Sequence, residues 1–209
     1  MLPKEYTTEI ESDIEKREVG ASLLTIYLGF NKNLKDIGNK NYSTFIYDDS
    51  IEKIADILPN NKTDFDKRSF TFVDYAQVDD SLAPVGKSTG VVCCIDYITD
   101  WNMLSKEEYK VKKEEVAQTY INRLEKLLPG IKDSVEYYEV GTSKTVERYT
   151  LNPQGAVYGF SQTPERVGLE PISKLENLYY ASAWTKIGGG FTGAIFNGYL
   201  TAFEILRKR

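Results

Sequence analysis

The chain alternates between runs of aliphatic and aromatic residues and short stretches of turn-forming residues. Residues 22–30 (SLLTIYLGF) are rich in the residue types that favour strands, and an asparagine-rich turn follows them. Residues 69–77 and 90–98 have the same character, and the modest loop between them predicts an antiparallel pair. The predicted strands together cover residues 22–30, 44–47, 69–77, 90–98, 135–140 and 178–183.

Helical signals lie between these strands. Ser105 and Glu108 have the spacing of a capping box, and Pro129-Gly130 predicts the end of the helix that follows. The apolar positions of this helix form an approximate stripe made of Val111, Val116, Tyr120, Leu124, Leu127 and Leu128. Two more helices are predicted, a short one from a cap at residues 48–50 through Leu58, stopped by Pro59, and a terminal one from about Gly190.

The order of these elements predicts an α+β fold with a mixed, largely antiparallel sheet covered by helices. The terminal helix places small and apolar residues on one broad face, which we expect to pack against a sheet. That face consists of Ala194, Ile195, Gly198, Ala202, Ile205 and Leu206.

Composition excludes several classes of function. The 209 residues include no histidine, so histidine triads, histidine-ligated metals and imidazole relays are excluded, and we expect no metal site. The net charge of −5 and the lack of a long basic run argue against nucleic acid as a partner. The length and the apolar content of 41% are those of one or two ordinary globular domains.

Cys93 and Cys94 are adjacent in a predicted strand, where they would point to opposite faces and be poorly placed for an ordinary disulfide. The amino terminus lacks a signal-peptide pattern, and the uncharged stretch 187–203 is too short and too rich in glycine for a membrane span. We therefore expect a reduced, cytoplasmic protein without a transmembrane segment, while peripheral membrane contact stays open.

Two glycine motifs resemble nucleotide-binding loops. Gly86-Lys87-Ser88 is not a Walker A loop, because Ser81 stands where the pattern needs its first glycine. Residues 188–193 (GGGFTG) satisfy G-x-G-x-x-G between a predicted strand and a predicted helix. Only sixteen residues follow Gly193, which excludes a Rossmann unit built on this loop.

The 188–193 loop has two interpretations of about equal weight. Glycines would let the backbone approach a ligand, and the helix after them would direct amide groups and partial positive charge toward a phosphate, a carboxylate or a cofactor carbonyl. Alternatively, the glycines let the terminal helix fold tightly against the segment before it.

Three segments resemble a known family when taken together. They are residues 80–87 (DSLAPVGK), 155–165 (GAVYGFSQTPE) and 177–194 (NLYYASAWTKIGGGFTGA). In order and spacing they are similar to the carboxyl-terminal part of the phytoene desaturase, carotenoid isomerase and retinol saturase family of FAD-dependent oxidoreductases. The likeness spans nearly the whole chain, and its last segment is the most specific.

This resemblance implies a substrate lobe that packs against an FAD-binding lobe, with a polyene in an apolar tunnel. Residues 1–140 would form the substrate-binding lobe, and residues 141–209 would return toward the FAD lobe. Ala183, Trp184 and Thr185 would lie near the flavin. The backbone amides of Gly188, Gly189, Gly190, Phe191, Thr192 and Gly193 would face its ribityl or pyrimidine end.

The sequence departs from the family pattern in three ways. Ser182 stands where glycine is usual, and Ile187 replaces the proline before the glycines. The amino-terminal FAD lobe is absent, so adenine and pyrophosphate contacts would come from elsewhere, in cis or in trans. We therefore expect this chain alone to hold FAD weakly.

Three interpretations follow from these observations. The chain is the carboxyl-terminal portion of a flavin oxidoreductase, a free-standing module that binds an apolar ligand without redox activity, or a stable α+β piece without activity of its own. Nothing in the sequence identifies a catalytic residue, and Glu165, Arg166 and Lys186 are expected to have solvated or structural roles. The choice among desaturation, saturation and isomerisation also stays open.

Overall fold

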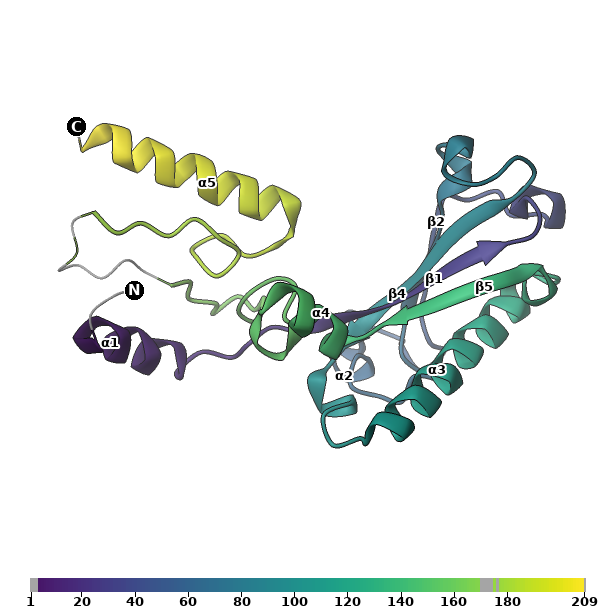
Figure 1. Cartoon of the computed structure of the whole chain (residues 1–209), viewed down its shortest axis with the longest axis horizontal. Helices are drawn as coiled ribbons and strands as arrows, with labels where there is room; N and C mark the ends of the chain where they lie inside the picture. The colour runs from purple at the N-terminus through teal and green to yellow at the C-terminus, as the bar shows by residue number, and fades with distance from the viewer. Residues whose placement is uncertain (1–3, 170–174, 176, 209) are drawn as a thin grey trace. The chain divides into compact units, whose positions relative to one another are not determined.

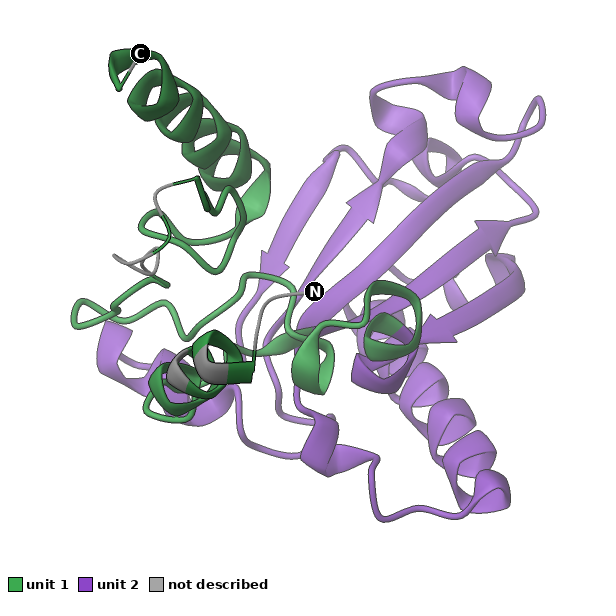
Figure 2. Cartoon of the chain, turned by 60° about the vertical axis from the view of Figure 1, so that its left-hand side comes forward, with its two compact units in different colours: residues 1–22, 146–209 green, residues 23–145 purple. Residues whose placement is uncertain are grey.

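The chain divides into two compact units. The computed structural model describes residues 4–169, 175 and 177–208. One unit, here called the sheet unit, consists of residues 23–145, and the other, the terminal unit, combines residues 1–22 with residues 146–209 (Figure 2).

A five-stranded sheet in the order β2-β3-β4-β1-β5 forms the centre of the sheet unit (Figure 1). The pairs β1–β5, β2–β3 and β3–β4 are antiparallel, with Thr71 opposite Cys93 in the last of these. The strands are β1 (Ser22–Phe30), β2 (Ser43–Ile46), β3 (Phe70–Asp74), β4 (Ser88–Asp96) and β5 (Val135–Gly141). The predicted α+β class and the antiparallel 69–77/90–98 pair are confirmed.

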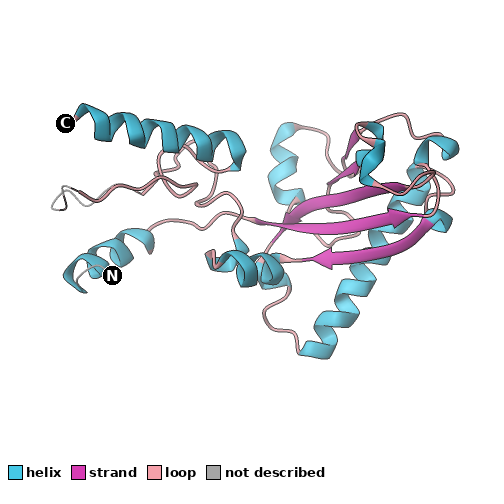
Figure 3. Cartoon of the chain, turned by 45° about the horizontal axis from the view of Figure 1, so that its top comes forward, coloured by secondary structure: helices cyan, strands magenta, loops and turns pink. Residues whose placement is uncertain are grey.

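Helices and short 3-10 turns join these strands (Figure 3). The helices are α1 (Lys4–Ile14), α2 (Ile57–Asn60), α3 (Lys106–Leu127), α4 (Ser143–Thr150) and α5 (Gly190–Arg207). The capping box is confirmed, because Ser105 accepts a hydrogen bond from the Glu108 amide while the Glu108 carboxylate accepts one from the Ser105 amide. Two helices are not among the predicted elements: α4, and α1, whose Tyr6, Ile10 and Ile14 recur every fourth residue.

The core of the sheet unit lies between one face of the sheet and α3 (Figure 1). Alternate residues of β1, from Leu24 to Phe30, are buried against Val116, Tyr120 and Leu124 of the predicted stripe. Two stripe residues, Val111 and Leu127, are exposed instead. The core side chain of Tyr120 donates a hydrogen bond to the buried Cys94 thiol, whereas Cys93 on the opposite face is half-buried, as alternation predicts.

Two predicted elements differ from the structure. Residues 178–183 do not form a strand, because side chains rather than a neighbouring strand bind the carbonyl groups of this segment. The helix predicted over residues 50–58 begins later, as a 3-10 turn at Ile54–Asp56 followed by α2. Pro59 lies inside α2 rather than ending it, since the amides of a first helical turn need no intrahelical partner.

Candidate functional site

The glycine loop and the start of α5 form a compact substructure in the terminal unit. Helix α5 begins at Gly190, whose φ of 82° favours glycine, and the preceding Gly189 cannot cap the helix with a side-chain bond. The first amide groups of a helix have no partner inside it and carry partial positive charge. This terminus therefore suits an anion or an electron-rich carbonyl, which is the chemistry that a flavin would bring.

Asn197 joins this loop to the helix. Its side chain is almost fully buried, and its amide nitrogen donates to the Ser182 carbonyl at 3.0 Å and to the Ile187 carbonyl. Its carbonyl oxygen accepts a hydrogen bond from the Ile187 amide at 3.2 Å. Thr201, one helical turn later, donates to the Tyr180 carbonyl at 3.1 Å. These polar side chains fix the conformation of residues 180–187 without a strand partner.

The loop packs against the second family-like segment, residues 155–165. The rings of Phe160 and Trp184 meet edge to face at 4.9 Å between centroids. A Cβ atom added to Gly189 would lie 2.4 Å from the Tyr158 Cα, and one added to Gly159 would lie 2.4 Å from the Ala183 carbonyl oxygen. Two motifs that lie far apart in sequence are therefore in direct backbone contact.

These contacts explain several glycines by packing. Gly188, Gly189 and Gly193 each have protein atoms where a side chain would be, whereas Gly190 faces only the Tyr158 ring, at 3.7 Å. Tight internal packing, one of the two interpretations of this loop, thus accounts for Gly189 and Gly193, whose added Cβ atoms would meet backbone atoms. At Gly188 the clash is only with the end of the Gln162 side chain, which can move, and at Gly190 only the Tyr158 ring lies within 4 Å.

Substitution of Gly193 by alanine is expected to lower the free energy of unfolding by about 1 to 3 kcal/mol, because the added Cβ would lie 2.2 Å from the Gly188 carbonyl oxygen. The matched control is Gly198→Ala in the same helix. No atom lies within 4 Å of that added Cβ, so this change is expected to stabilise the helix by up to about 1 kcal/mol. Urea unfolding of both variants measures the two changes in the free energy of unfolding, which should have opposite signs. Equal changes would contradict the packing role of Gly193.

The predicted cofactor residues differ in accessibility. Thr185 is buried, and its hydroxyl donates to the Ser182 carbonyl at 2.7 Å, so this hydroxyl is already used inside the protein. Ala183 and Trp184 are half-buried, and Phe191 and Thr192 are exposed. Phe191 and Thr192 are therefore the exposed residues of the predicted site, and Gly188, Gly189 and Gly190 are half-buried.

Helix α5 exposes apolar side chains and buries a polar one. The predicted inward face is wrong, because Ala194, Ile195, Ala202 and Leu206 are exposed while Gly193 and Asn197 are the buried positions. Apolar residues surround the helix on nearly all sides, so their pattern does not select one face. The helix therefore has an exposed apolar surface, here called the α5 surface. It consists of Phe191, Ile195, Phe196, Tyr199, Leu200, Phe203 and Leu206.

Three rings on the α5 surface are stacked. The ring centroids of Phe196 and Tyr199 are 6.1 Å apart, and those of Tyr199 and Phe203 are 6.4 Å apart, with interplanar angles of 22° and 15°. A contiguous exposed apolar patch of this kind marks a surface that binds another protein segment or an apolar ligand.

In the sheet unit, the strand face opposite α3 carries half-buried apolar residues. A pocket of about 260 Å³ on this unit is lined by residues that include Leu23, Phe45, Thr71, Cys93 and Ile95. Alternation places these side chains opposite the buried Leu24, Phe70 and Cys94. The open face can therefore contact an apolar ligand along several neighbouring strands.

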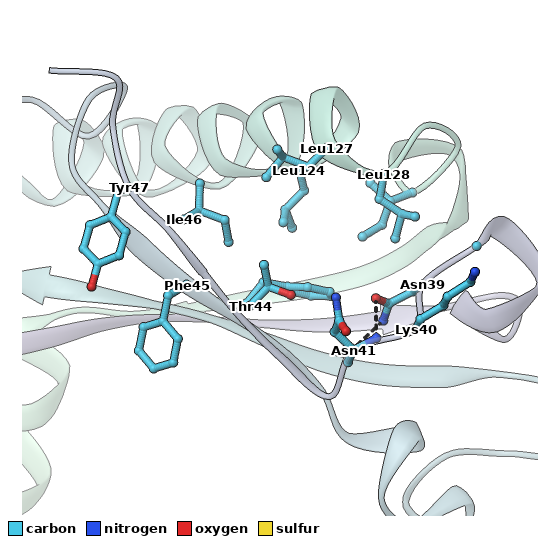
Figure 4. Close-up of a pocket in the computed structure, with 13 residues that line it drawn as sticks. Asn39, Lys40, Asn41, Thr44, Phe45, Ile46, Tyr47, Leu124, Leu127 and Leu128 are labelled. Atoms are coloured by element: carbon cyan, nitrogen blue, oxygen red, sulfur yellow. Dashed lines mark hydrogen bonds between the residues drawn. The ribbon is translucent and has the colours of Figure 1, made fainter. Parts of the chain in front are cut away.

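A larger pocket of about 510 Å³ lies at the other side of the sheet unit, between β2 and the end of α3 (Figure 4). Leu124, Leu127 and Leu128 face Thr44 and Ile46 across it (Figure 4). The polar residues Asn39, Lys40 and Asn41 also line it. Volume and lining are those of a small-molecule pocket with apolar walls and a few polar groups.

Sequence analysis missed a buried polar cluster where β4 ends. The Asp96 carboxylate accepts hydrogen bonds from the Trp101 ring at 2.9 and 3.1 Å and from the Ser143 amide at 2.7 Å. The Arg68 guanidinium lies 4.0 Å from it and contacts Asp100 at 3.1 Å. Burial raises the pKa of Asp96 despite these donors. Because Arg68 and Ser143 lie far from Asp96 in sequence, no local motif predicts this cluster.

The first family-like segment, residues 80–87, lies in the sheet unit. It begins with a 3-10 turn at Asp80–Leu82, which Asp79 caps by accepting a hydrogen bond from the Ser81 amide. Hydrogen bonds from Ser81 hold the pKa of Asp79 below its usual value. The side chain of Val85 is fully exposed, and Lys87 pairs with Glu136 at 2.7 Å. The segment forms an ordered exposed loop.

Comparison with curated proteins identifies several relatives. Prolycopene isomerase of Daucus carota is 34% identical over 132 residues, which cover 61% of this chain and 22% of the carrot protein. All-trans-retinol 13,14-reductase of Danio rerio is 26% identical over an alignment of 230 residues, which covers the whole chain and 38% of the fish protein. 4,4'-Diaponeurosporene oxygenase of Staphylococcus aureus is 26% identical over 155 residues.

The chain thus spans between about a fifth and two fifths of the length of these relatives. No family model matches it. Proteins named for action on carotenoids and retinoids are nevertheless its relatives, and the resemblance predicted from the three motifs is confirmed. The chain is similar to a part of proteins of the carotenoid isomerase and retinol saturase family.

Proposed function

We propose that this chain is the carboxyl-terminal, flavin-contacting and substrate-binding portion of an FAD-dependent oxidoreductase that acts on a polyene such as a carotenoid or a retinoid. The relatives are named for reactions of such compounds, and they are longer than this chain. The remaining FAD-binding lobe would be supplied in cis or in trans. A cytoplasmic location belongs to the same proposal, because a reducing compartment keeps the thiols of Cys93 and Cys94 free.

The observation that carries this proposal is the organisation of α5. A helix that buries Asn197 and exposes the aromatic rings of the α5 surface is poorly explained as the outer helix of an independent domain. It is well explained as a helix whose apolar side meets a further lobe, while its amino-terminal amides point toward a cofactor. The predicted flavin-directed segment, residues 141–209, contains this helix.

The chain's own residues fit a flavin through backbone groups rather than through side chains. The uncapped turn at residues 190–192 offers amides and a helix terminus to an electron-rich carbonyl and favours negative charge at a reduced ring. When bound, FAD would accept a hydride from, or donate one to, a carbon atom of the substrate's carbon–carbon bond. The neighbouring carbon would exchange a proton with a base or with solvent. The protein's part is to place the bond and to exclude water.

The sheet unit supports the substrate role proposed for residues 1–140. Its open face presents half-buried apolar side chains over several strands, together with the pocket lined by Leu23 and Cys93. An extended polyene needs a long apolar wall of this kind. No helix among the described residues has the length and apolar character needed to cross a membrane.

Capture of an FAD-binding lobe tests the proposal. We expect the tagged chain, isolated from its native source, to carry a partner or an attached segment with a flavin spectrum, whereas the isolated chain with excess FAD retains much less than one equivalent. Replacing Phe196, Tyr199 and Phe203 together by serine should abolish this capture, since these rings form the stacked part of the α5 surface. Tyr149→Ser, at an exposed ring that lines neither pocket, is the control.

A second candidate function rests on the 510 Å³ pocket. A free-standing module could hold an apolar ligand between β2 and α3 without redox chemistry. Retinol titration of the isolated chain, followed by ligand fluorescence, separates the candidates. Tight binding of retinol without flavin, abolished by Leu128→Lys in the pocket wall, would favour the module. If capture of a flavin-binding partner also fails, the flavoprotein proposal is contradicted.

A further inference from the structure

The guanidinium of Arg166 lies among backbone carbonyl groups of residues 183–186. These residues begin the segment 183–193 that is predicted to contact the flavin, here called the flavin-contacting loop. Its Nη2 donates to the carbonyls of Thr185 at 2.7 Å and of Ala183 at 3.0 Å. Its Nη1 donates to the Lys186 carbonyl at 3.0 Å. One side chain thus binds three carbonyls of the four-residue segment 183–186. This segment lies about twenty residues after Arg166 in the sequence.

The segment that carries Arg166 is itself held in place. The Arg17 guanidinium donates to the Gly168 carbonyl at 2.6 Å and also binds the Val167 carbonyl and the Asp13 carboxylate. The Leu169 amide donates to the Trp184 carbonyl at 2.8 Å. A Cβ atom added to Gly168 would lie 2.3 Å from the Thr185 carbonyl oxygen, so the two segments are in backbone contact.

This arrangement uses properties that only arginine has. The guanidinium is planar, stays charged at all physiological pH values, and presents several N–H groups in fixed directions. Three carbonyls can therefore be bound at once. Lysine carries the same charge on a single nitrogen and cannot reproduce that pattern.

We propose that Arg166 is the positioning residue of the flavin-contacting loop, holding the Ala183, Thr185 and Lys186 carbonyls so that the Trp184 ring and the start of α5 keep the geometry that receives the cofactor. This inference rests on the function proposed above. Asn197 fixes the other side of the same loop through Ser182 and Ile187. The loop is therefore held from two directions, by Arg166 and by helix α5.

Hydrogen–deuterium exchange of the chain tests the structural half of this inference without any flavin. We expect Arg166→Ala to increase exchange of residues 181–189 at least about tenfold, because opening of the loop no longer breaks three charge-assisted hydrogen bonds. Arg166→Lys should restore only part of the protection. Arg148→Ala is the matched control, since Arg148 is exposed and contacts only the Tyr149 ring in the contacts described.

The functional half is tested on the flavin-bound complex captured from the native source. Arg166→Ala should weaken flavin retention and shift the visible spectrum of the flavin that remains. Low-millimolar guanidinium, which can donate to the same carbonyls in the space left by the truncated side chain, should restore both the spectrum and the exchange protection.

The outcomes are distinguishable. Unchanged exchange in Arg166→Ala, or an equal increase in Arg148→Ala, overturns the inference whatever the flavin does. Faster exchange with an unaltered flavin spectrum and affinity also overturns it, because the loop geometry would then be irrelevant to the cofactor. Absence of flavin from the wild-type complex contradicts the proposed function instead, and the exchange measurement still decides whether Arg166 holds the loop.

Discussion

Asp96→Ala is expected to lower the free energy of unfolding of the sheet unit by about 3 to 5 kcal/mol, the usual cost of removing one partner from a buried charged cluster. Asp96 and Trp101 are fully buried, and the substitution leaves the Trp101 ring N–H and the Ser143 amide without an acceptor. Arg68 also loses a nearby negative charge. Urea unfolding monitored by circular dichroism measures the change.

Two variants separate the contributions within this cluster. Trp101→Phe removes the ring N–H while keeping most of the apolar volume, so Asp96→Ala should cost less in that background than in the wild type. Asp100→Ala removes the partially exposed carboxylate that binds Arg68 and should cost less than Asp96→Ala. A loss below about 1 kcal/mol for Asp96→Ala would contradict the anchoring role.

The consequence of losing Asp96 reaches beyond the sheet. Asp96 ends β4, and Ser143 begins α4 directly after β5, so the carboxylate ties two strand ends to the start of a helix. The chain passes from the sheet unit to the terminal unit within that helix. We therefore expect the amides at residues 142–145 to lose exchange protection together in the variant.

Asn197→Leu is expected to release the 182–187 loop and to lower the free energy of unfolding of the terminal unit by about 2 to 4 kcal/mol, since it leaves several buried backbone groups without partners. The Ser182 and Ile187 carbonyls lose a donor, and the Ile187 amide loses its acceptor. Leucine is of similar size and favours helices, so loss of hydrogen bonds dominates the result. Hydrogen exchange of residues 180–189 is the direct measurement.

Asn122→Leu provides the matched control for this substitution. Asn122 also lies in a helix, but it is exposed and contacts the Lys132 ammonium. Its replacement should change stability by less than about 0.5 kcal/mol. If both leucine variants unfold alike, Asn197 does not organise the loop, and the internal support proposed for the predicted flavin-contacting segment is lost.

Local features of the fold were predictable from the sequence. The capping box at Ser105 and Glu108, the opposite orientations of Cys93 and Cys94 and the start of the terminal helix at Gly190 all depend on residues within a few positions of one another. The same short-range pattern misplaced the end of the 50–58 helix, because Pro59 is compatible with a first helical turn.

The candidate site was predictable only in part. Its motif residues and its family resemblance could be recognised in the sequence. Which of their side-chain groups are free to contact a cofactor could not. Thr185 has the residue type of a cofactor contact, but its hydroxyl is bonded to the Ser182 carbonyl. Arg166 was expected to have a solvated or structural role, and the carbonyl groups it binds became visible only in the folded chain.

The sequence by itself determined the α+β class, the antiparallel strand pair, the capped long helix and the family resemblance, since these depend on periodicity and on motifs in order. The tertiary structure decided which face of α5 is buried, which glycines are required by packing, and how Asp96, Arg166 and Asn197 satisfy distant backbone groups. The physical reason is that hydrogen-bond partners and excluded volume are set by residues far apart in the chain. A helix with apolar residues on nearly every side carries no local signal for its buried face.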